Sequence, residues 1–186
     1  IIVVGSAPRG KSVLRSGARP GDRIYVSGKL GASTAAILKL NHPPNNRLNP
    51  RDYLRHFYPE PRIKLGRILR ETRLASAMID TSDGLSTDLR HLCEESGVGA
   101  ELDAARIPCA SVGRPARTVE FDLALHGGED YELLFTTRPG KQMPGKIAGV
   151  PLTEIGRITR SRAILLRNLS GVVSELKPRG WEHFRK

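Results

Sequence analysis

Two aspartates and a serine stand within four residues of each other in the run IDTSDG, residues 79–84, where a short apolar segment gives way to a helical pattern. Mg²⁺ prefers oxygen ligands, commonly one or two carboxylates with phosphate and water, and helix N-terminal amides attract anions. Asp80, Ser82 and Asp83 are therefore compatible with a magnesium–phosphate site. A helix-capping arrangement of Asp80 with Asp83 explains the same spacing without any ligand.

A second acidic cluster follows two glycines in the run GGEDYE, residues 127–132. Paired glycines let a backbone approach a ligand closely. Glu129, Asp130 and Glu132 then stand at a turn-to-strand junction in a chain that is otherwise basic. The run is compatible with a ligand contact and equally with a solvated turn.

Two single residues could complete a site for a phosphate and a ring. Arg15 opens the small-residue loop RSGA, and a guanidinium can bind a phosphate with two parallel hydrogen bonds. Trp181, the only tryptophan, lies in the run GWEHF near the end of the chain. Its ring could stack on a heteroaromatic ligand or anchor the C-terminal segment on the core.

Other candidates for chemistry are weaker. The five histidines show no ligand spacing, and neither Cys93 nor Cys109 has an obvious base beside it. The run GKLGAST, residues 28–34, lacks the residue order of a phosphate-binding P-loop. The sequence therefore names no catalytic residue.

The elements that must position these residues mix strands and helices without regular βαβ alternation. We expect strands at residues 23–27, 75–80, 99–102, 131–137, 152–158, 163–166 and 172–173. We expect helices at residues 33–40, 50–57, 82–96 and 116–125, one opening at Pro61, and a weak one over 138–149. The pattern predicts an α+β domain with a mixed sheet.

Composition sets limits on function. The 186 residues include 30 Lys and Arg against 19 Asp and Glu, a net charge of +11 that admits nucleic acid as a partner. The basic residues are scattered and do not interleave with aromatics, so nucleic acid is not favoured. Two cysteines form no disulfide framework and indicate a reducing, cytoplasmic setting. No apolar run approaches the roughly 18 residues of a membrane span, so no membrane partner is expected.

The chain begins with Ile1 rather than Met, in a run typical of a β-strand. We therefore predict that residues 1–10 are the last strand of a preceding ATP-binding domain. Residues 11–186 would then form a C-terminal domain of a longer protein.

Four runs in a fixed order, RSGARPGDRIYVSG, PEPRIKLGRIL, SAMIDTSDGLSTDLRHL and GGEDYELLFT, together with GWEHF, resemble the thiamine-monophosphate kinase family. The resemblance covers residues 12–184. It implies a layered α/β/α domain, ferredoxin-like in part, as in the aminoimidazole ribonucleotide synthetase superfamily. It also implies Mg²⁺-assisted transfer of the ATP γ-phosphoryl group to thiamine phosphate, by a homodimer whose N-terminal half carries most metal-binding acids. We therefore expect no kinase activity from residues 1–186 alone.

The resemblance assigns roles residue by residue: Asp80 and Asp83 as magnesium ligands, Ser82 and Arg15 as ATP contacts, and Glu129 and Trp181 as thiamine-phosphate contacts. The acceptor is itself an anionic phosphate, so the absence of a general base fits this reaction. Three alternatives stay open: a superfamily relative with another substrate, such as an enzyme of aminoimidazole ribonucleotide or selenophosphate synthesis, a basic nucleic-acid-binding module, and a standalone domain that binds thiamine phosphate without turnover.

Overall fold

A computed structural model describes residues 6–41 and 48–181. The strand expected at the start of the chain falls largely on residues 1–5, which lie outside the described residues. Residues 6–10 hold a turn and no strand, with the N–H of Lys11 donating to the carbonyl of Pro8 at 2.9 Å.

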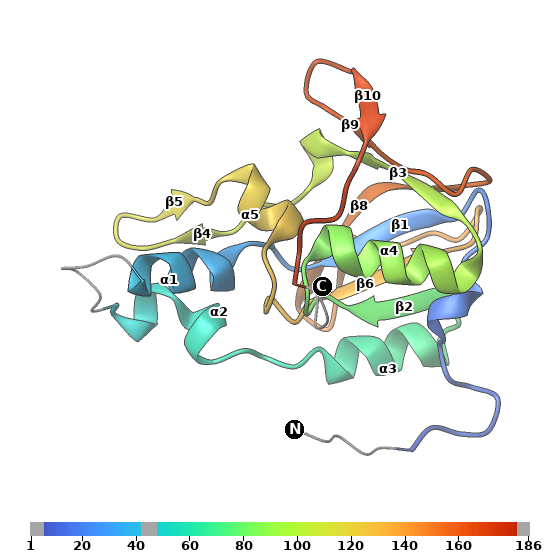
Figure 1. Ribbon diagram of the computed structural model, residues 1–186. Helices are drawn as coiled ribbons and strands as arrows, with labels where there is room; N and C mark the ends of the chain where they lie inside the picture. The colour runs from blue at the N-terminus through green and yellow to red at the C-terminus, as the bar shows by residue number, and fades with distance from the viewer. Residues whose placement is uncertain (1–5, 42–47, 182–186) are drawn as a thin grey trace.

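An eight-stranded mixed sheet forms the centre of the molecule (Figure 1). Its strands are β1 Arg23–Ser27, β2 Ala77–Asp80, β3 Gly99–Asp103, β6 Leu133–Thr137, β7 Lys146–Ile147, β8 Val150–Thr159, β9 Ile164–Arg167 and β10 Val173–Glu175. The order is β10-β9-β3-β8-β1-β6-β2, with β7 beside β8. The β3–β9 pair is parallel and the other pairs are antiparallel, including the β9–β10 hairpin. A separate small hairpin joins β4 Ser111–Val112 to β5 Arg117–Thr118.

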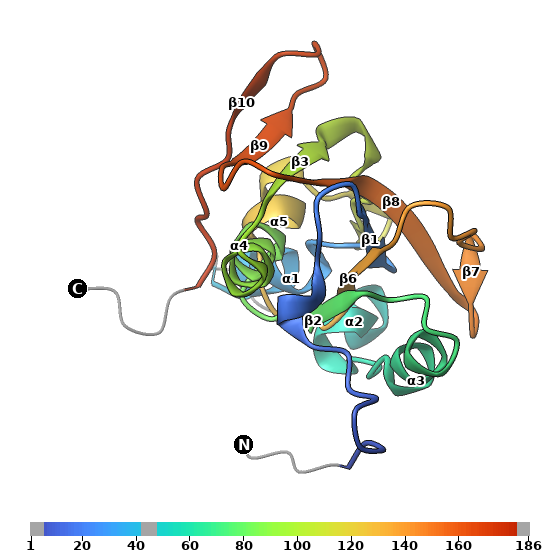
Figure 2. The same ribbon diagram turned by 90° about the vertical axis from the view of Figure 1, so that its right-hand side faces the viewer.

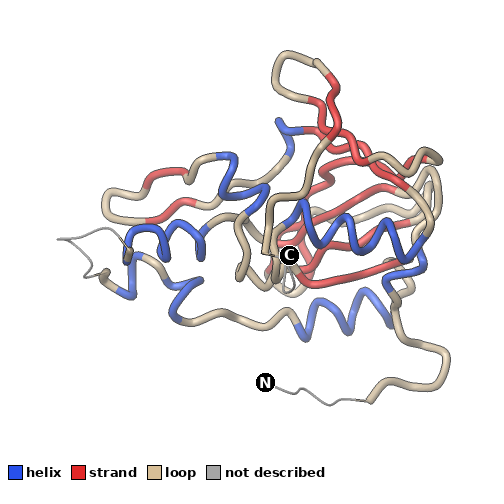
Figure 3. The backbone as a smooth tube through the Cα atoms, in the orientation of Figure 1, coloured by secondary structure: helices blue, strands red, loops and turns tan. Residues whose placement is uncertain are grey.

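Helices cover both faces of this sheet, with α4 on one side and α3 on the other (Figure 2). The α-helices are α1 Ala32–Leu40, α2 Leu54–Phe57, α3 Ile63–Glu71, α4 Leu85–Ser96 and α5 Phe121–His126. Three short 3₁₀ helices are η1 Arg15–Gly17, η2 Pro50–Asp52 and η3 Ala104–Arg106 (helices blue in Figure 3). The predicted layered α+β architecture with a mixed sheet is confirmed. Within residues 6–41 and 48–181, no helix is long and apolar enough to cross a bilayer.

The strand period of two divides the core between the two faces. Along β1, Ile24 and Val26 are buried in the cluster under α4, whereas Tyr25 belongs to the cluster under α3. On β6, Leu134 joins the first cluster and Phe135 the second. Tyr25 and Phe135 stack with their ring centroids 5.6 Å apart. Burial of each such side chain stabilises the fold by roughly 2 kcal/mol.

Helix α4 forms over most of the predicted range 82–96 but begins at Leu85, so Ser82 and Asp83 lie in the turn before it. Leu85, Leu89, Leu92 and Cys93, spaced to share one face, are all buried against the sheet. Gly97 ends the helix in the left-handed region at φ 67°. This packing fixes the place of the residues that precede Leu85.

Three of the expected helices differ in the structure. Residues 138–149 hold no α-helix, because Pro139, Gly140 and the later Pro–Gly pair break any helical pattern. The helix expected over 116–125 begins only at Phe121, since the preceding residues pair in the β4–β5 hairpin. The expected helix at 50–57 divides into η2 and α2.

The two acidic runs lie at the same end of the sheet. Strands β2 and β6 are antiparallel neighbours, with Asp80 opposite Leu133, so the end of β2 meets the beginning of β6. Residues 81–84 then lead into α4, and residues 127–132 lead into β6.

Candidate functional site at the end of strands β2 and β6

The two acidic runs are held together by backbone hydrogen bonds. The N–H of Glu129 donates to the carbonyl of Ser82 at 2.8 Å, and the N–H of Tyr131 donates to the carbonyl of Thr81 at 3.0 Å. In return, the N–H of Thr81 donates to the carbonyl of Glu132 at 2.8 Å. The IDTSDG and GGEDYE runs therefore form one rigid unit.

Glycines permit this close approach. A Cβ on Gly128 would lie 2.5 Å from the carbonyl oxygen of Ser82. Gly84 has a φ of 111°, and a Cβ there would lie 2.4 Å from the carbonyl oxygen of His126. Since the atoms in the way belong to the backbone, any larger residue at either position would separate the two runs.

The C-terminal segment passes the start of α4 and joins the same unit (Figure 1). The N–H of Gly180 donates to Oγ1 of Thr87 at 3.1 Å, and the N–H of Trp181 donates to the carbonyl of Asp83 at 3.0 Å. A Cβ on Gly180 would stand 2.0 Å from that carbonyl oxygen. Trp181 is therefore placed by its backbone, and its side chain is 66% exposed.

A pocket of about 600 Å³ opens where these segments meet. It is lined by Thr34, Ile37, Ser82, Asp83, Gly128, Glu129, Tyr131 and Trp181. The structure thus brings together four of the six residues that the sequence singles out: Ser82, Asp83, Glu129 and Trp181.

The other two predicted residues lie outside this lining. Asp80 is exposed at the end of β2, three residues before Asp83. The carbonyl of Arg15 accepts a hydrogen bond from Oγ of Ser96 at 2.7 Å, at the far end of α4. The 12 residues of α4 separate its two ends by roughly 18 Å. Within the described chain, Arg15 is therefore not placed with Asp83.

Asp88 performs the capping that the sequence offered as an alternative role for Asp80 and Asp83. Its Oδ2 accepts hydrogen bonds from the N–H groups of Asp83 at 3.1 Å and Gly84 at 3.0 Å. The carboxyl is buried, which raises its pKa to about 7, with repulsion from Asp83 and Asp80 adding to the effect. The capping interpretation is wrong in detail. The accepting carboxylate at the start of α4 belongs to Asp88, and Asp83 contributes only its backbone N–H as a donor.

The remaining acids of the second run have structural roles. Asp130 is buried and caps α1, its carboxylate accepting from the N–H groups of Gly31 at 2.6 Å and Ser33 at 3.3 Å. Burial raises the pKa of this carboxyl to about 6. The anion-binding end of α1 is thus occupied by Asp130, which agrees with the absence of a P-loop.

Glu132 forms a buried ion pair. Its two carboxylate oxygens accept from Nε and Nη2 of Arg62 at 2.7 and 2.6 Å. Ser27 donates its hydroxyl to the same carboxylate at 2.5 Å. Sequence reasoning missed Arg62, Asp88 and the burial of Glu132. No strand alternation could have shown this burial, because Glu129 and Tyr131 both have positive φ, 63° and 52°, and the segment before β6 is not extended.

The pocket is acidic. The pKa of Tyr131 is raised by burial and by the nearby charges of Glu129, Asp80 and Asp83. Carboxylate oxygens are the donors that Mg²⁺ prefers, so Asp80 and Asp83 fit as two of its ligands. Among the described residues, no group of three or more His, Cys, Asp or Glu could hold a metal. Further ligands would have to be phosphate oxygens, water or groups from elsewhere.

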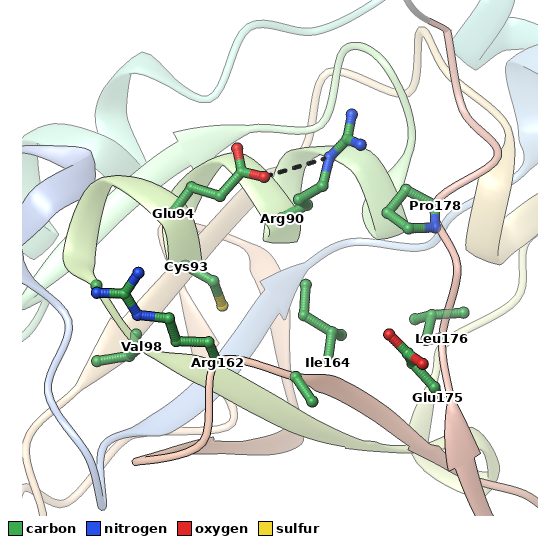
Figure 4. Close-up of a pocket in the computed structure, with 11 residues that line it drawn as sticks. Arg90, Cys93, Glu94, Val98, Arg162, Ile164, Glu175, Leu176 and Pro178 are labelled. Carbon is green, nitrogen blue, oxygen red and sulfur yellow. Dashed lines mark ion pairs between the residues drawn. The ribbon is translucent and has the colours of Figure 1, made fainter.

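A second pocket, of about 380 Å³, lies between α4 and the β9–β10 hairpin (Figure 4). Arg90 and Glu94 form an ion pair of 3.9 Å at its edge. Burial raises the pKa of Cys93 in its lining to about 12, so the thiol stays protonated and is not a nucleophile. None of the predicted site residues lines this pocket, and we take the first pocket as the candidate site.

This fold and site define a known class of protein. Residues 19–165 match the family described as AIR synthase related protein, C-terminal domain, and the chain belongs to that family.

The individual relatives are more specific. The chain is 40% identical to thiamine-monophosphate kinase of Escherichia coli K12 over 97% of its own length and 58% of that protein's length. It resembles the crystal structure of thiamine-monophosphate kinase from Stenotrophomonas maltophilia, with a TM-score of 0.71 and 33% identity over 86% of this chain and 54% of that one. A structure described as AaThiL complexed with AMPPCP and TMP matches with a TM-score of 0.73 and 32% identity, over 92% and 54% of the two chains. The chain thus spans little more than half the length of these relatives.

Proposed function

We propose that this chain is part of an ATP-dependent kinase that converts thiamine phosphate to thiamine diphosphate. The observation that carries the proposal is the single pocket that Ser82, Asp83, Glu129 and Trp181 line together. The relatives named thiamine-monophosphate kinase support the reaction, and the structure described with AMPPCP and TMP supports the two substrates. A homodimeric whole protein and a cytoplasmic location stay predictions.

The residues present suit phosphoryl transfer between two phosphates. Bound Mg²⁺ would neutralise the phosphate charges whose repulsion otherwise opposes the reaction. Asp80 and Asp83 would hold it, with Ser82 contacting ATP. The ATP contact expected of Arg15 stays a prediction, because Arg15 lies at the far end of α4 and outside the pocket. The acceptor oxygen belongs to a phosphate that is already anionic, so the chain needs no general base, and we assign no catalytic residue.

Glu129 and Trp181 would bind the organic part of thiamine phosphate. The Glu129 carboxylate is exposed in the pocket and suits the cationic thiazolium or the aminopyrimidine. The exposed indole of Trp181 offers a face on which one of these rings can stack. Because Asp83 and Glu129 make the pocket acidic, it should bind the cationic ring of the ligand more readily than a negatively charged group.

The test is a kinase assay on this chain extended to the length of its relatives, with thiamine phosphate and the acceptors of the related superfamily enzymes compared. We expect turnover with thiamine phosphate.

Replacing Glu129 with Gln should raise the KM for thiamine phosphate about tenfold with little change in kcat, because a ground-state contact is removed. Glu95→Gln, at an exposed position of α4 outside the pocket, is the matched control. An unchanged KM in Glu129→Gln would remove Glu129 from the substrate site, and turnover with another acceptor alone would refute the proposed reaction.

A further inference from the structure

Three consecutive carbonyl groups hold the backbones of three pocket residues. The carbonyls of Thr81, Ser82 and Asp83 accept the N–H groups of Tyr131, Glu129 and Trp181 respectively, at 3.0, 2.8 and 3.0 Å. One turn therefore sets the positions of all three side chains. The proposed function gives roles to Glu129 and Trp181 but none to Tyr131.

The backbone of Tyr131 has an unusual conformation. Its φ is 52°, in the left-handed region that costs a bulky residue of order 1 kcal/mol or more. The neighbouring carboxylates of Asp130 and Glu132 are both buried and tied to other elements, so the fold holds the strained residue between them. Strain that the surroundings impose in this way is characteristic of functional sites.

The side chain of Tyr131 stands in the pocket and not in the core. It is 42% exposed and shares the lining with Trp181 and Ile37. Three carboxylates, those of Glu129, Asp80 and Asp83, lie close enough to act on its phenol. An aromatic face beside concentrated negative charge is suited to a cationic heteroaromatic ring.

We propose that Tyr131 is a third substrate-contacting residue, whose ring packs against the heteroaromatic part of the ligand and determines specificity for it. This proposal rests on the proposed function, since it concerns the same pocket and the same ligand. It assigns Tyr131 no contact with the phosphate of the ligand.

Calorimetric titrations of this chain, extended to the length of its relatives, with thiamine phosphate and with thiamine test the proposal. Tyr131→Leu should weaken binding of both ligands by the same factor, about tenfold, because the ring is common to them. Tyr131→Phe should stay within about twofold of the wild type, because it keeps the ring. Tyr58→Leu removes a tyrosine that is 68% exposed outside the pocket, and should change nothing.

Thermal unfolding of the same variants separates ligand contact from support of the fold. A ligand-contacting residue held in strain can be replaced with little loss of stability, so Tyr131→Gly should lose affinity while its unfolding midpoint stays near or above that of the wild type. Wild-type affinity in Tyr131→Leu, together with weakened binding in Glu129→Gln, would overturn the role of Tyr131 alone. If wild-type protein binds neither ligand, the proposed function fails and this proposal fails with it. A fall in the midpoint of Tyr131→Gly that accounts for its loss of affinity would make Tyr131 a structural residue and overturn the proposal.

Discussion

Acids of the GGEDYE run divide by position into two kinds. Glu129 lines the pocket, whereas Asp130 and Glu132 are buried and bind the N-terminus of α1 and the guanidinium of Arg62. The sequence shows three acids in four residues, but the run itself does not show which of them are buried. It does not show that Arg62, seventy residues earlier, is the partner that makes burial of Glu132 possible.

Asp130 makes stability depend on pH. Its pKa in the fold is about 6 because of burial, above the ordinary value of 3.8. Between about pH 4 and pH 6 the folded protein keeps a proton that the unfolded chain has lost, so stability falls as pH rises through this window. Titration of Asp130 changes the free energy of unfolding by at most ~1.4 kcal/mol per pH unit.

Asp130→Asn should remove this contribution and keep a side-chain oxygen for the N–H of Gly31. Relative to wild type, the variant should therefore gain stability as pH rises from about 4 to about 6, and the difference should level off above that. Urea unfolding of both proteins at half-unit intervals would measure it. A difference that is constant across the window would contradict the role assigned to the carboxyl.

The helices and strands position the site residues through their packing, and only part of that packing can be predicted from the sequence. The apolar stripe of Leu85, Leu89, Leu92 and Cys93 predicted α4, although not its start at Leu85, and the strands β1 and β6 were predicted close to their observed bounds. The break of the 50–57 helix at Tyr53 and the β4–β5 hairpin are both local features, and neither has an apolar stripe or alternation that would predict it. Arg15 could not be placed relative to Asp83 either, since their separation follows from the length of α4.

The Arg62–Glu132 pair should be the most sensitive link between elements. Their side chains are 3% and 1% exposed, so Arg62→Ala leaves a buried carboxylate without its main partner and should cost about 3 kcal/mol of stability. Arg67→Ala is the matched control, because Arg67 pairs with Glu71 on the exposed surface of the following helix and should cost less than about 1 kcal/mol. Denaturant unfolding compares the two. Equal losses of unfolding free energy in Arg62→Ala and Arg67→Ala would show that the buried ion pair stabilises the fold no more than the exposed one.

On the scale of the whole molecule, the chain matches little more than half the length of its relatives. It spans 58% of its Escherichia coli relative, and its described residues include no group of three potential metal-ligating residues. Some of the 30 Lys and Arg side chains are neutralised by acids, as Arg138 is by Asp22 and Arg157 is by Glu101. Binding of a small ligand in the pocket is the property that we propose to test in this chain.

Fluorescence of the single tryptophan tests the central claim most directly, because Trp181 lines the pocket. Titration of the chain with thiamine phosphate should give a saturable change in Trp181 emission. Glu129→Gln should shift the midpoint about tenfold higher, as expected when one charge contact of about 1.4 kcal/mol is lost. Emission that does not change, over a concentration range in which calorimetry also detects no binding, would contradict a thiamine-phosphate site in this pocket.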